Sequence, residues 1–185
     1  EISCSLVGSE MCIRDRHEIE CENIISPSID YDSEESSNII GTLNMLRVQY
    51  KADMIVGTSL GEFYAAVLSA RHDLPAMLVN PCLTPFLLDI LSDFKTRPLV
   101  QLFNELEKIE LSNVSCIVGD ADELLGNHAF TEKLLGNARF RRIKDGKHSG
   151  YTLPLKAFFS EMLQYYMAIL PLKEGAECIS SDLSD

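Results

Sequence analysis

Short apolar runs alternate with segments of helical apolar spacing along most of the chain. Apolar or alternating runs bounded by glycine, proline or polar clusters are typical of strands, and five are predicted, over residues 23–29, 52–56, 76–79, 114–118 and 139–143. Helical spacing lies between them, over residues 39–50, 60–70 and 130–135 and in two pieces between 83 and 111, and residues 151–170 close the fold. Ser33 or Ser36 can cap the first helix. Strands and helices in this alternation favour an α/β fold, with a mostly parallel sheet and helices on both faces.

The chain length of 185 residues fits one domain with a sizeable core. We assign residues 17–170 to this domain, and we interpret residues 83–111 as a helical, cap-like insertion that could cover a site. Residues 171–185 are acidic and rich in serine, with too few apolar groups to pack. They are predicted to form a disordered tail.

The first sixteen residues have an unusual sequence. The run SLVGSEMCIRDR, residues 5–16, is similar to the conceptual translation of a transposon-type sequencing adapter. The alternative is a natural segment with a weak strand over residues 2–7. We favour the adapter interpretation and exclude residues 1–16 from the expected fold, which then begins near His17 with its first strand or strands missing.

Charge and hydropathy exclude several classes of protein. The formal net charge of −12 opposes binding to a phosphate backbone, so no nucleic-acid partner is expected. No apolar run reaches the 18 residues or more of a membrane-spanning helix, and no secretory signal is recognised at the N-terminus. The chain is therefore expected to be soluble and cytoplasmic, without a membrane partner.

The cysteines and acidic residues do not match a metal site. The six cysteines are widely spaced without a CxxC pair: Cys4, Cys12, Cys21, Cys82, Cys116 and Cys178. A group on one loop, Asp120, Asp122, Glu123 and His128, could be read as metal ligands, but its spacing matches no ligand pattern. We expect no metal and no cofactor.

A Gly-x-Ser-x-Gly motif stands at Gly57-Thr58-Ser59-Leu60-Gly61. It falls between a predicted apolar strand and a predicted helix, where a sharp turn can hold a serine hydroxyl out at the end of a strand. Glycines on either side leave room for the turn and for close packing of strand and helix. Ser59 is therefore a candidate nucleophile, and the alternative is that it only caps the helix.

A serine hydroxyl needs a base to take its proton and an acid to orient that base. The loop after the fourth predicted strand offers Asp122, with Asp120 as an alternative and Glu123 as a solvated neighbour. The loop after the fifth offers His148, whose imidazole suits proton transfer near neutral pH. The order Ser59, Asp122, His148 is that of α/β-hydrolases.

The other three histidines, His17, His72 and His128, have no evident partner and are predicted to lie on the surface.

The oxyanion hole of such an enzyme takes one backbone N–H from the residue after the nucleophile, here Leu60. The second N–H comes from a loop after an early strand. The sequence identifies no such loop, and we expect it to be missing with the N-terminus.

The motifs together resemble the YqiA-like small esterases, cytoplasmic α/β-hydrolases of bacteria. The run IVGTSLGEFYA at 55–65 resembles their nucleophile turn, and LPAMLVNP at 74–81 followed by Pro85 and Phe86 resembles their Asn-Pro segment. The resemblance covers residues 17–163, with Asp122 and His148 at the positions of the family's acid and base. Glu62 departs from the usual small residue, and the opening His-Gly-Phe segment is absent. The resemblance implies an α/β-hydrolase fold and hydrolysis of small esters with short acyl chains through an acyl-enzyme.

Two other functions fit part of the pattern. The run GTSLGEF at 57–63 is also similar to the active-site turn of malonyl transferases, although those enzymes are longer and use an arginine that cannot be placed here. The second is a hydrolase-like fold without activity that serves as an interaction domain, because a fold does not establish a function.

Overall fold

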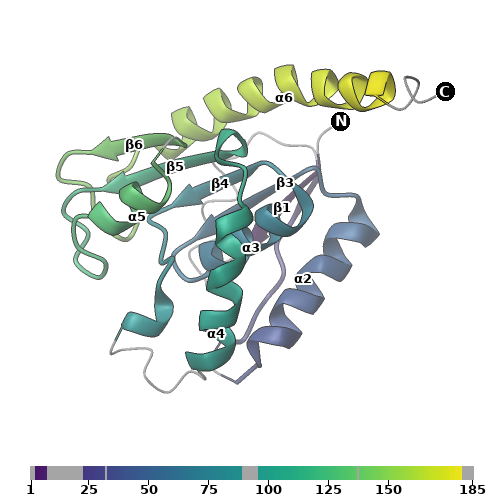
Figure 1. Cartoon of the computed structure of the whole chain (residues 1–185). Coiled ribbons are helices and arrows are strands. Elements are labelled where there is room, and N and C mark those ends of the chain that lie inside the picture. Colours follow the sequence, from purple (N-terminus) through teal and green to yellow (C-terminus); the bar gives the residue numbers. More distant parts are fainter. Residues whose placement is uncertain (1–2, 8–22, 32, 89–95, 137, 181–185) are drawn as a thin grey trace.

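Six parallel strands form one sheet in the computed structural model, which describes residues 3–7, 23–31, 33–88, 96–136 and 138–180. The strands lie in the order β2-β1-β3-β4-β5-β6 (Figure 1). Their bounds are β1 Ser3–Val7, β2 Asn23–Ile25, β3 Met54–Thr58, β4 Ala76–Val79, β5 Val114–Gly119 and β6 Arg139–Ile143. Because all neighbours pair in parallel, the carboxyl ends of the strands share one edge of the sheet.

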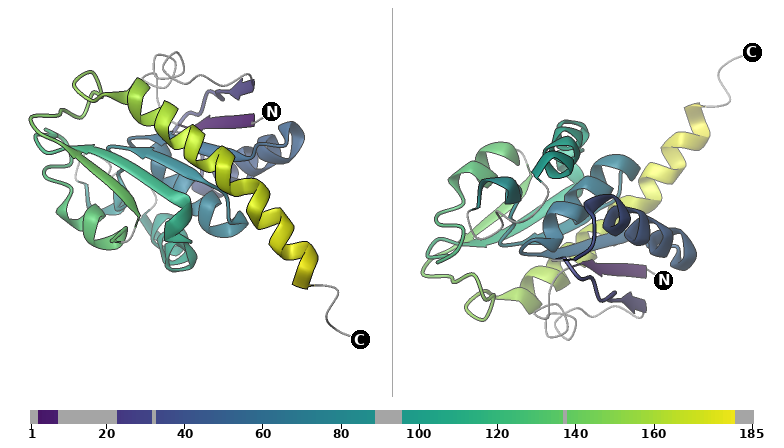
Figure 2. Two further views of the ribbon diagram at one scale, coloured as in Figure 1. Left: turned by 90° about the horizontal axis from the view of Figure 1, so that it is seen from above. Right: turned by 90° about the horizontal axis from the view of Figure 1, so that it is seen from below.

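Helices cover both faces of the sheet, as the sequence pattern predicts. The α-helices are α2 Ser36–Tyr50, α3 Gly61–His72, α4 Thr96–Phe103, α5 Ala129–Leu134 and α6 Leu155–Ser180. Short 3-10 turns lie at η2 Pro85–Leu87, η4 Asn104–Lys108 and η5 Leu111–Asn113. Figures 1 and 2 show α6 crossing one face of the sheet, with α2, α3 and α4 on the other.

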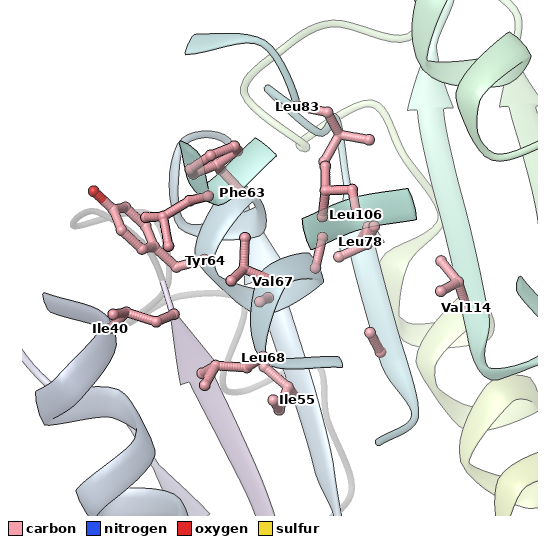
Figure 3. Packing of buried hydrophobic residues seen from close by; sticks show 14 of the residues in the cluster. Ile40, Ile55, Phe63, Tyr64, Val67, Leu68, Leu78, Leu83, Leu106 and Val114 are labelled. Carbon is pink, nitrogen blue, oxygen red and sulfur yellow. The ribbon is translucent and has the colours of Figure 1, made fainter. Parts of the chain in front are cut away.

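The larger apolar core lies on the face covered by α2, α3 and α4. Alternate strand residues such as Ile55 and Leu78 point to this face and pack against the α3 side chains Phe63, Val67 and Leu68 (Figure 3). All five are at most 2% exposed. Helix α3 is buried on most of its surface, because small alanine and glycine residues let it approach the sheet closely.

The intervening strand residues point to the other face and pack under α6. Met54, Val56 and Met77 are fully buried there against Phe159 and Tyr166 of the helix. Burial on both faces explains why the central strands are continuous apolar runs rather than alternating ones. Although α6 has 26 residues, no helix in the described parts of the chain is both long and apolar enough to cross a membrane.

The exclusion of residues 1–16 from the fold is wrong for β1. Ser3–Val7 forms an interior strand, paired with β2 from Ser3↔Asn23 and with β3 from Cys4↔Met54 to Val7↔Gly57. The polarity pattern of residues 2–7 indicated a weak strand only as the alternative, because an interior strand is fixed by the backbone pairing of both neighbours as well as by its own side chains. Residues 8–22 lie outside the described residues.

Three further predictions need correction. Helix α6 runs to Ser180, so residues 171–180 are helical rather than a disordered tail, although this stretch includes Pro171 and Gly175. Neither Ser33 nor Ser36 caps α2, because the N-cap residue is Glu35. The described parts of residues 83–111 are not a separate insertion, since Leu99, Leu102 and Leu106 belong to the main core beside α3, while residues 89–95 lie outside the described residues.

Candidate functional site

Ser59 sits in a strained turn between β3 and α3. Its φ of 53° lies in the left-handed region, which a residue with a side chain rarely adopts. The backbone holds the turn from two sides: the Ser59 N–H donates to the Val79 carbonyl, and the Cys82 N–H donates to the Ser59 carbonyl, both at 3.3 Å. Gly57 is required here, because a Cβ at this position would lie 2.6 Å from the Glu62 Cα. The strand and helix therefore fix the direction of the hydroxyl.

A chain of hydrogen bonds joins the three residues that the sequence singled out. The Ser59 Oγ lies 2.9 Å from the His148 Nε2, and the His148 Nδ1 lies 2.8 Å from the Asp122 Oδ2. The three side chains come from the loops after β3, β5 and β6, which meet at the carboxyl edge of the parallel sheet. The predicted contact between positions 59, 122 and 148 is thus present in the fold.

The Asp122 carboxylate is buried and fully hydrogen bonded. Its Oδ1 accepts the backbone N–H groups of Leu124 and Leu125, each at 2.8 Å, and its Oδ2 faces two histidines. Burial by itself raises the pKa of Asp122, but hydrogen bonds from His128, His148 and the two amides outweigh it and hold the pKa well below its usual range. Asp122 is therefore an ionised acceptor at neutral pH.

The negative charge on Asp122 determines which ring nitrogen of His148 carries hydrogen. A carboxylate without a proton can only accept, so the His148 Nδ1 that faces it carries hydrogen. In neutral His148 the Nε2 then has its lone pair directed at the Ser59 hydroxyl, which donates to it. This is the protonation state in which an imidazole can receive the proton of a serine.

His128 is not a surface residue, contrary to the sequence prediction. It is 4% exposed, and its Nε2 lies 2.8 Å from the same Asp122 Oδ2 that faces His148. The loop returns on itself between the two residues, since Gly126 bridges to Asp122 and both Gly126 and His128 have a positive φ. The signal in the sequence was a histidine six positions after the candidate acid, with a glycine between them.

The other two histidines do not enter the site. His72 lies at the last residue of α3 and is partly exposed, at the end of the helix remote from Ser59. His17 lies outside the described residues.

Asp120 and Glu123 support the two loops without contacting the imidazole ring. The Asp120 Oδ1 accepts the N–H of Asp145 at 2.6 Å, and the Glu123 Oε2 accepts the N–H of His148 at 3.2 Å. The alternative of Asp120 as partner of the histidine therefore fails on geometry. Within the described ranges, no group of three or more histidine, cysteine, aspartate or glutamate side chains could hold a metal ion.

The buried side-chain amide of Asn80 connects the ends of three strands through hydrogen bonds. Asn80 follows β4 and is 1% exposed, and its Oδ1 accepts the Gly119 N–H at 2.8 Å. Its Nδ2 donates to the carbonyl oxygens of Lys147 and His148, at 3.0 and 2.9 Å. The polar member of the Asn-Pro segment thus connects the loop of Asp122 with the loop of His148.

The backbones of these two loops also touch directly. A Cβ on Gly119 would lie 2.2 Å from the Gly146 carbonyl oxygen, and a Cβ on Gly146 would lie 2.7 Å from the Gly119 Cα. Only glycine at both positions allows this approach.

The backbone N–H of Leu60 stands at the start of α3, directly after Ser59 in the sequence. The Glu62 and Phe63 amides donate to the carbonyls of Ser59 and Leu60, but the Leu60 N–H is one of the first donors of the helix, which lack partners within it. The second donor that the sequence did not identify would follow an early strand. Strand β1 ends beside Gly57, and the segment after it lies outside the described residues.

A cavity of about 200 Å³ opens between the loops after β4 and β5. Apolar residues make much of its wall, including Leu83, Leu88 and Leu125, and His128 also lines it. Cys82 also lines it, but burial raises the pKa of this thiol to about 12, which leaves no thiolate at neutral pH to act as a nucleophile. The cavity is a small space at the same sheet edge as Ser59.

Several solved α/β-hydrolase structures resemble the whole fold. A putative hydrolase of the α/β superfamily from Xanthomonas campestris pv. campestris has a TM-score of 0.64 at 17% identity, covering 88% of this chain and 97% of the other. A structure from work on the metagenome-derived lipolytic enzymes LipS and LipT has a TM-score of 0.65 at 9% identity, covering 90% and 93%. A structure from work on carboxylesterases of the thaumarchaeon Nitrososphaera gargenis has a TM-score of 0.54 at 12% identity, covering 92% and 90%.

At these identities the likeness establishes the α/β-hydrolase fold alone. No curated protein matches the chain. Residues 18–123, more than half of the sequence, match the model of the uncharacterised protein family UPF0227. The chain therefore belongs to UPF0227, the YqiA-like family that its sequence motifs resemble, and has the α/β-hydrolase fold.

Proposed function

We propose that the chain is a serine hydrolase that cleaves carboxylic esters with short acyl chains through an acyl-enzyme. The observation that carries the proposal is the continuous line of hydrogen bonds from the Ser59 hydroxyl through His148 to the buried Asp122. The solved structures of similar fold support the class of reaction, since their descriptions include carboxylesterases and lipolytic enzymes. In this proposal Ser59 is the nucleophile, His148 the general base and acid, and Asp122 the orienting carboxylate.

In the first half of the reaction, the Ser59 Oγ attacks the ester carbonyl carbon while the His148 Nε2 takes the hydroxyl proton. The new imidazolium is stabilised by Asp122, which lies 2.8 Å from its Nδ1. When the tetrahedral intermediate collapses, the bond from carbon to the alkoxy oxygen breaks, and His148 gives its proton to that oxygen. An alcohol leaves, and the acyl group stays on Ser59.

In the second half, the His148 Nε2 takes a proton from water as the water oxygen attacks the acyl carbon. Collapse of the second tetrahedral intermediate breaks the bond to the Ser59 Oγ, which regains the proton from His148. The products are a carboxylic acid and the free enzyme, so protons and charges balance over the cycle. The Leu60 N–H stabilises the negative oxygen in both halves, with a preorganised dipole at the start of α3.

The cavity near the site is small, and neither Ser59 nor His148 is among the residues that line it. Its volume of about 200 Å³ is below the range of ordinary ligand pockets, which starts at about 300 Å³. Its wall combines leucine side chains with Thr84, Asn127 and His128. In this proposal the short acyl chain of the ester occupies this cavity beside the reacting residues.

The fold favours hydrolysis over the malonyl-transferase alternative, because the solved structures of similar fold that are described above are α/β-hydrolases. Burial of the free thiols of Cys82 and Cys116 agrees with a reducing, cytoplasmic location.

The test is labelling of the full chain with a fluorophosphonate probe, together with hydrolysis of p-nitrophenyl acetate and butyrate. Wild type is expected to label at one site and to release p-nitrophenol, whereas Ser59→Ala should do neither. Ser112→Ala, an exposed serine before β5, serves as the matched control and should behave as wild type. A folded wild type without labelling or hydrolysis would instead support the inactive interaction domain, and labelling of Ser59→Ala would contradict the assignment of the nucleophile.

A further inference from the structure

His128 and His148 share one carboxylate oxygen. Both nitrogens lie 2.8 Å from the Asp122 Oδ2, while the Oδ1 is occupied by the Leu124 and Leu125 amides. The side chains of His128 and Asp122 are 1% and 0% exposed, so water does not compete for this contact. A second buried histidine on this oxygen goes beyond what an aspartate needs to orient one imidazole.

We infer that His128 is a positioning residue, which holds Asp122 so that its Oδ2 accepts from the His148 Nδ1 in the productive orientation. This inference rests on the proposed function, in which His148 must keep its Nε2 lone pair toward Ser59. Since Asp122 only accepts, the His128 Nε2 donates a hydrogen to it, and this fixes the lateral position of the oxygen that His148 uses. The hydrogen bond to the Ser59 Oγ comes from His148, whereas the side chain of His128 bonds to Asp122.

The local geometry supports a specific role rather than ordinary filling of the core. His128 has a φ of 55°, an uncommon conformation that directs its ring back to Asp122 across the turn at Gly126. An apolar side chain could fill the same space, but it would leave the Oδ2 with one donor. Loss of a hydrogen bond to a buried charged group changes the balance between orientations of the carboxylate.

The same ring forms part of the wall of the cavity between the loops after β4 and β5. A change at position 128 can therefore alter substrate binding as well as the orientation of Asp122. The two effects separate in steady-state kinetics: a disturbed wall raises KM, whereas a disturbed base lowers kcat.

The experiment compares His128→Gln with His128→Leu in the full chain. A glutamine amide can reach the position of the imidazole Nε2 and donate to Asp122, whereas leucine fills the volume without a donor. We expect kcat for p-nitrophenyl butyrate to fall about 10-fold in His128→Leu and to stay within about 3-fold of wild type in His128→Gln. His72→Leu, a partly exposed histidine at the far end of α3, is the matched control and should keep wild-type kinetics.

Two further measurements distinguish positioning from a general loss of structure. In an Asp122→Asn background, His128→Leu should cause little further loss of kcat, because the oxygen that it positions has been replaced. Nitrogen NMR of the His148 ring should show hydrogen on Nδ1 in wild type and in His128→Gln, and a mixture of tautomers in His128→Leu. Replacement of His148 by alanine assigns the signal.

The outcomes separate this inference from the proposed function. A wild type without ester hydrolysis would end the proposed function, but the tautomer measurement would still test the contact of His128 with Asp122 and its effect on His148. Equal kcat in His128→Leu and wild type, a KM effect alone, or an unchanged His148 tautomer in His128→Leu would overturn the inference. An equal loss of kcat in both variants would also overturn it, since the donor that His128→Gln retains would then make no difference to kcat.

Discussion

Asn80 holds the backbone of His148 directly, because its Nδ2 donates to the His148 carbonyl oxygen at 2.9 Å. The same side chain accepts from Gly119, three residues before Asp122, so one buried amide fixes the relative position of the two loops that supply the acid and the base. We expect Asn80→Asp to retain the shape and the acceptor but to place a carboxylate oxygen against two carbonyl oxygens.

For Asn80→Asp, the expected result is a fall in kcat of at least about 10-fold and a loss of about 2 kcal/mol in the free energy of unfolding. Ester kinetics and urea unfolding measure the two effects. Because Asn80 has a φ of 53°, Asn80→Gly is the companion variant: it keeps the backbone conformation and removes all three side-chain bonds. Wild-type kcat in Asn80→Gly would show that the amide does not position His148.

Strain at Ser59 gives a second prediction. The left-handed conformation costs a non-glycine residue about 1 kcal/mol or more, and glycine adopts it without that cost. Ser59→Gly should therefore be more stable than Ser59→Ala by about 1 kcal/mol, although both lack the hydroxyl and should be inactive. Thermal or urea unfolding compares the two, and equal stabilities would show that the turn relaxes in the variants.

The close contact of Gly119 with Gly146 gives a third prediction. A methyl group on Gly119 would lie 2.2 Å from the Gly146 carbonyl oxygen, which is backbone and cannot rotate away. Gly119→Ala should lower the free energy of unfolding by about 3 kcal/mol and reduce kcat by separating Asp122 from His148. Gly41→Ala on α2 is the control, because nothing lies within 4 Å of a Cβ there, and it should be neutral or slightly stabilising.

The lowered pKa of Asp122 predicts how stability depends on acid. The folded state keeps this carboxylate ionised below the pH at which the unfolded chain takes up its proton, about 3.9. Its contribution to stability is therefore complete above that pH and is lost as the pH falls toward the folded pKa.

The difference in unfolding free energy between wild type and Asp122→Asn should accordingly narrow by about 1 kcal/mol from pH 5 to pH 3. Urea titrations at several pH values measure it. A difference that stays constant over this range would contradict an ionised, hydrogen-bonded Asp122.

The raised pKa of Tyr166 in α6 predicts how stability depends on alkaline pH. Its hydroxyl donates to the Asn113 carbonyl oxygen at 2.8 Å and lies 2.7 Å from the Ser115 Oγ, and burial raises its pKa to about 12. An unfolded tyrosine loses its proton near pH 10, so the stability contributed by the neutral phenol is complete below about pH 10 and is lost as the pH rises toward 12. Tyr166→Phe should cost about 1 kcal/mol at neutral pH.

The loss of stability from pH 10 to 12 should be less steep in Tyr166→Phe than in wild type. Circular dichroism in urea at each pH provides the measurement, and Tyr151→Phe, at an exposed tyrosine, provides the control. Identical alkaline slopes in wild type and Tyr166→Phe would contradict the raised pKa.

The pattern of apolar and polar residues was enough to predict those strands whose bounds depend on the local sequence alone. The strands at 76–79 and 139–143 have the predicted bounds, since an apolar or alternating run between breakers determines them. The positions of Ser59, Asp122 and His148 were also predictable, because each follows a strand and parallel strands bring their ends to one edge.

The contributions of His128 and Asn80 depend on contacts that spacing does not encode. His128 reaches Asp122 only through a turn with two positive φ values, and Asn80 bonds to residues 39 and 67 or more positions away. The strand over residues 2–7 was only the less favoured alternative for a related reason, as the place of β1 follows from pairing with β2 and β3.

The parallel arrangement also leaves the amino edge of the sheet without any part in the proposed chemistry. Lys51 lies at that edge, exposed between α2 and β3, while Ser59 lies beyond the opposite end of the same strand. A surface anchor or fluorescent label attached through position 51 would hold the molecule with its reactive side facing the solution.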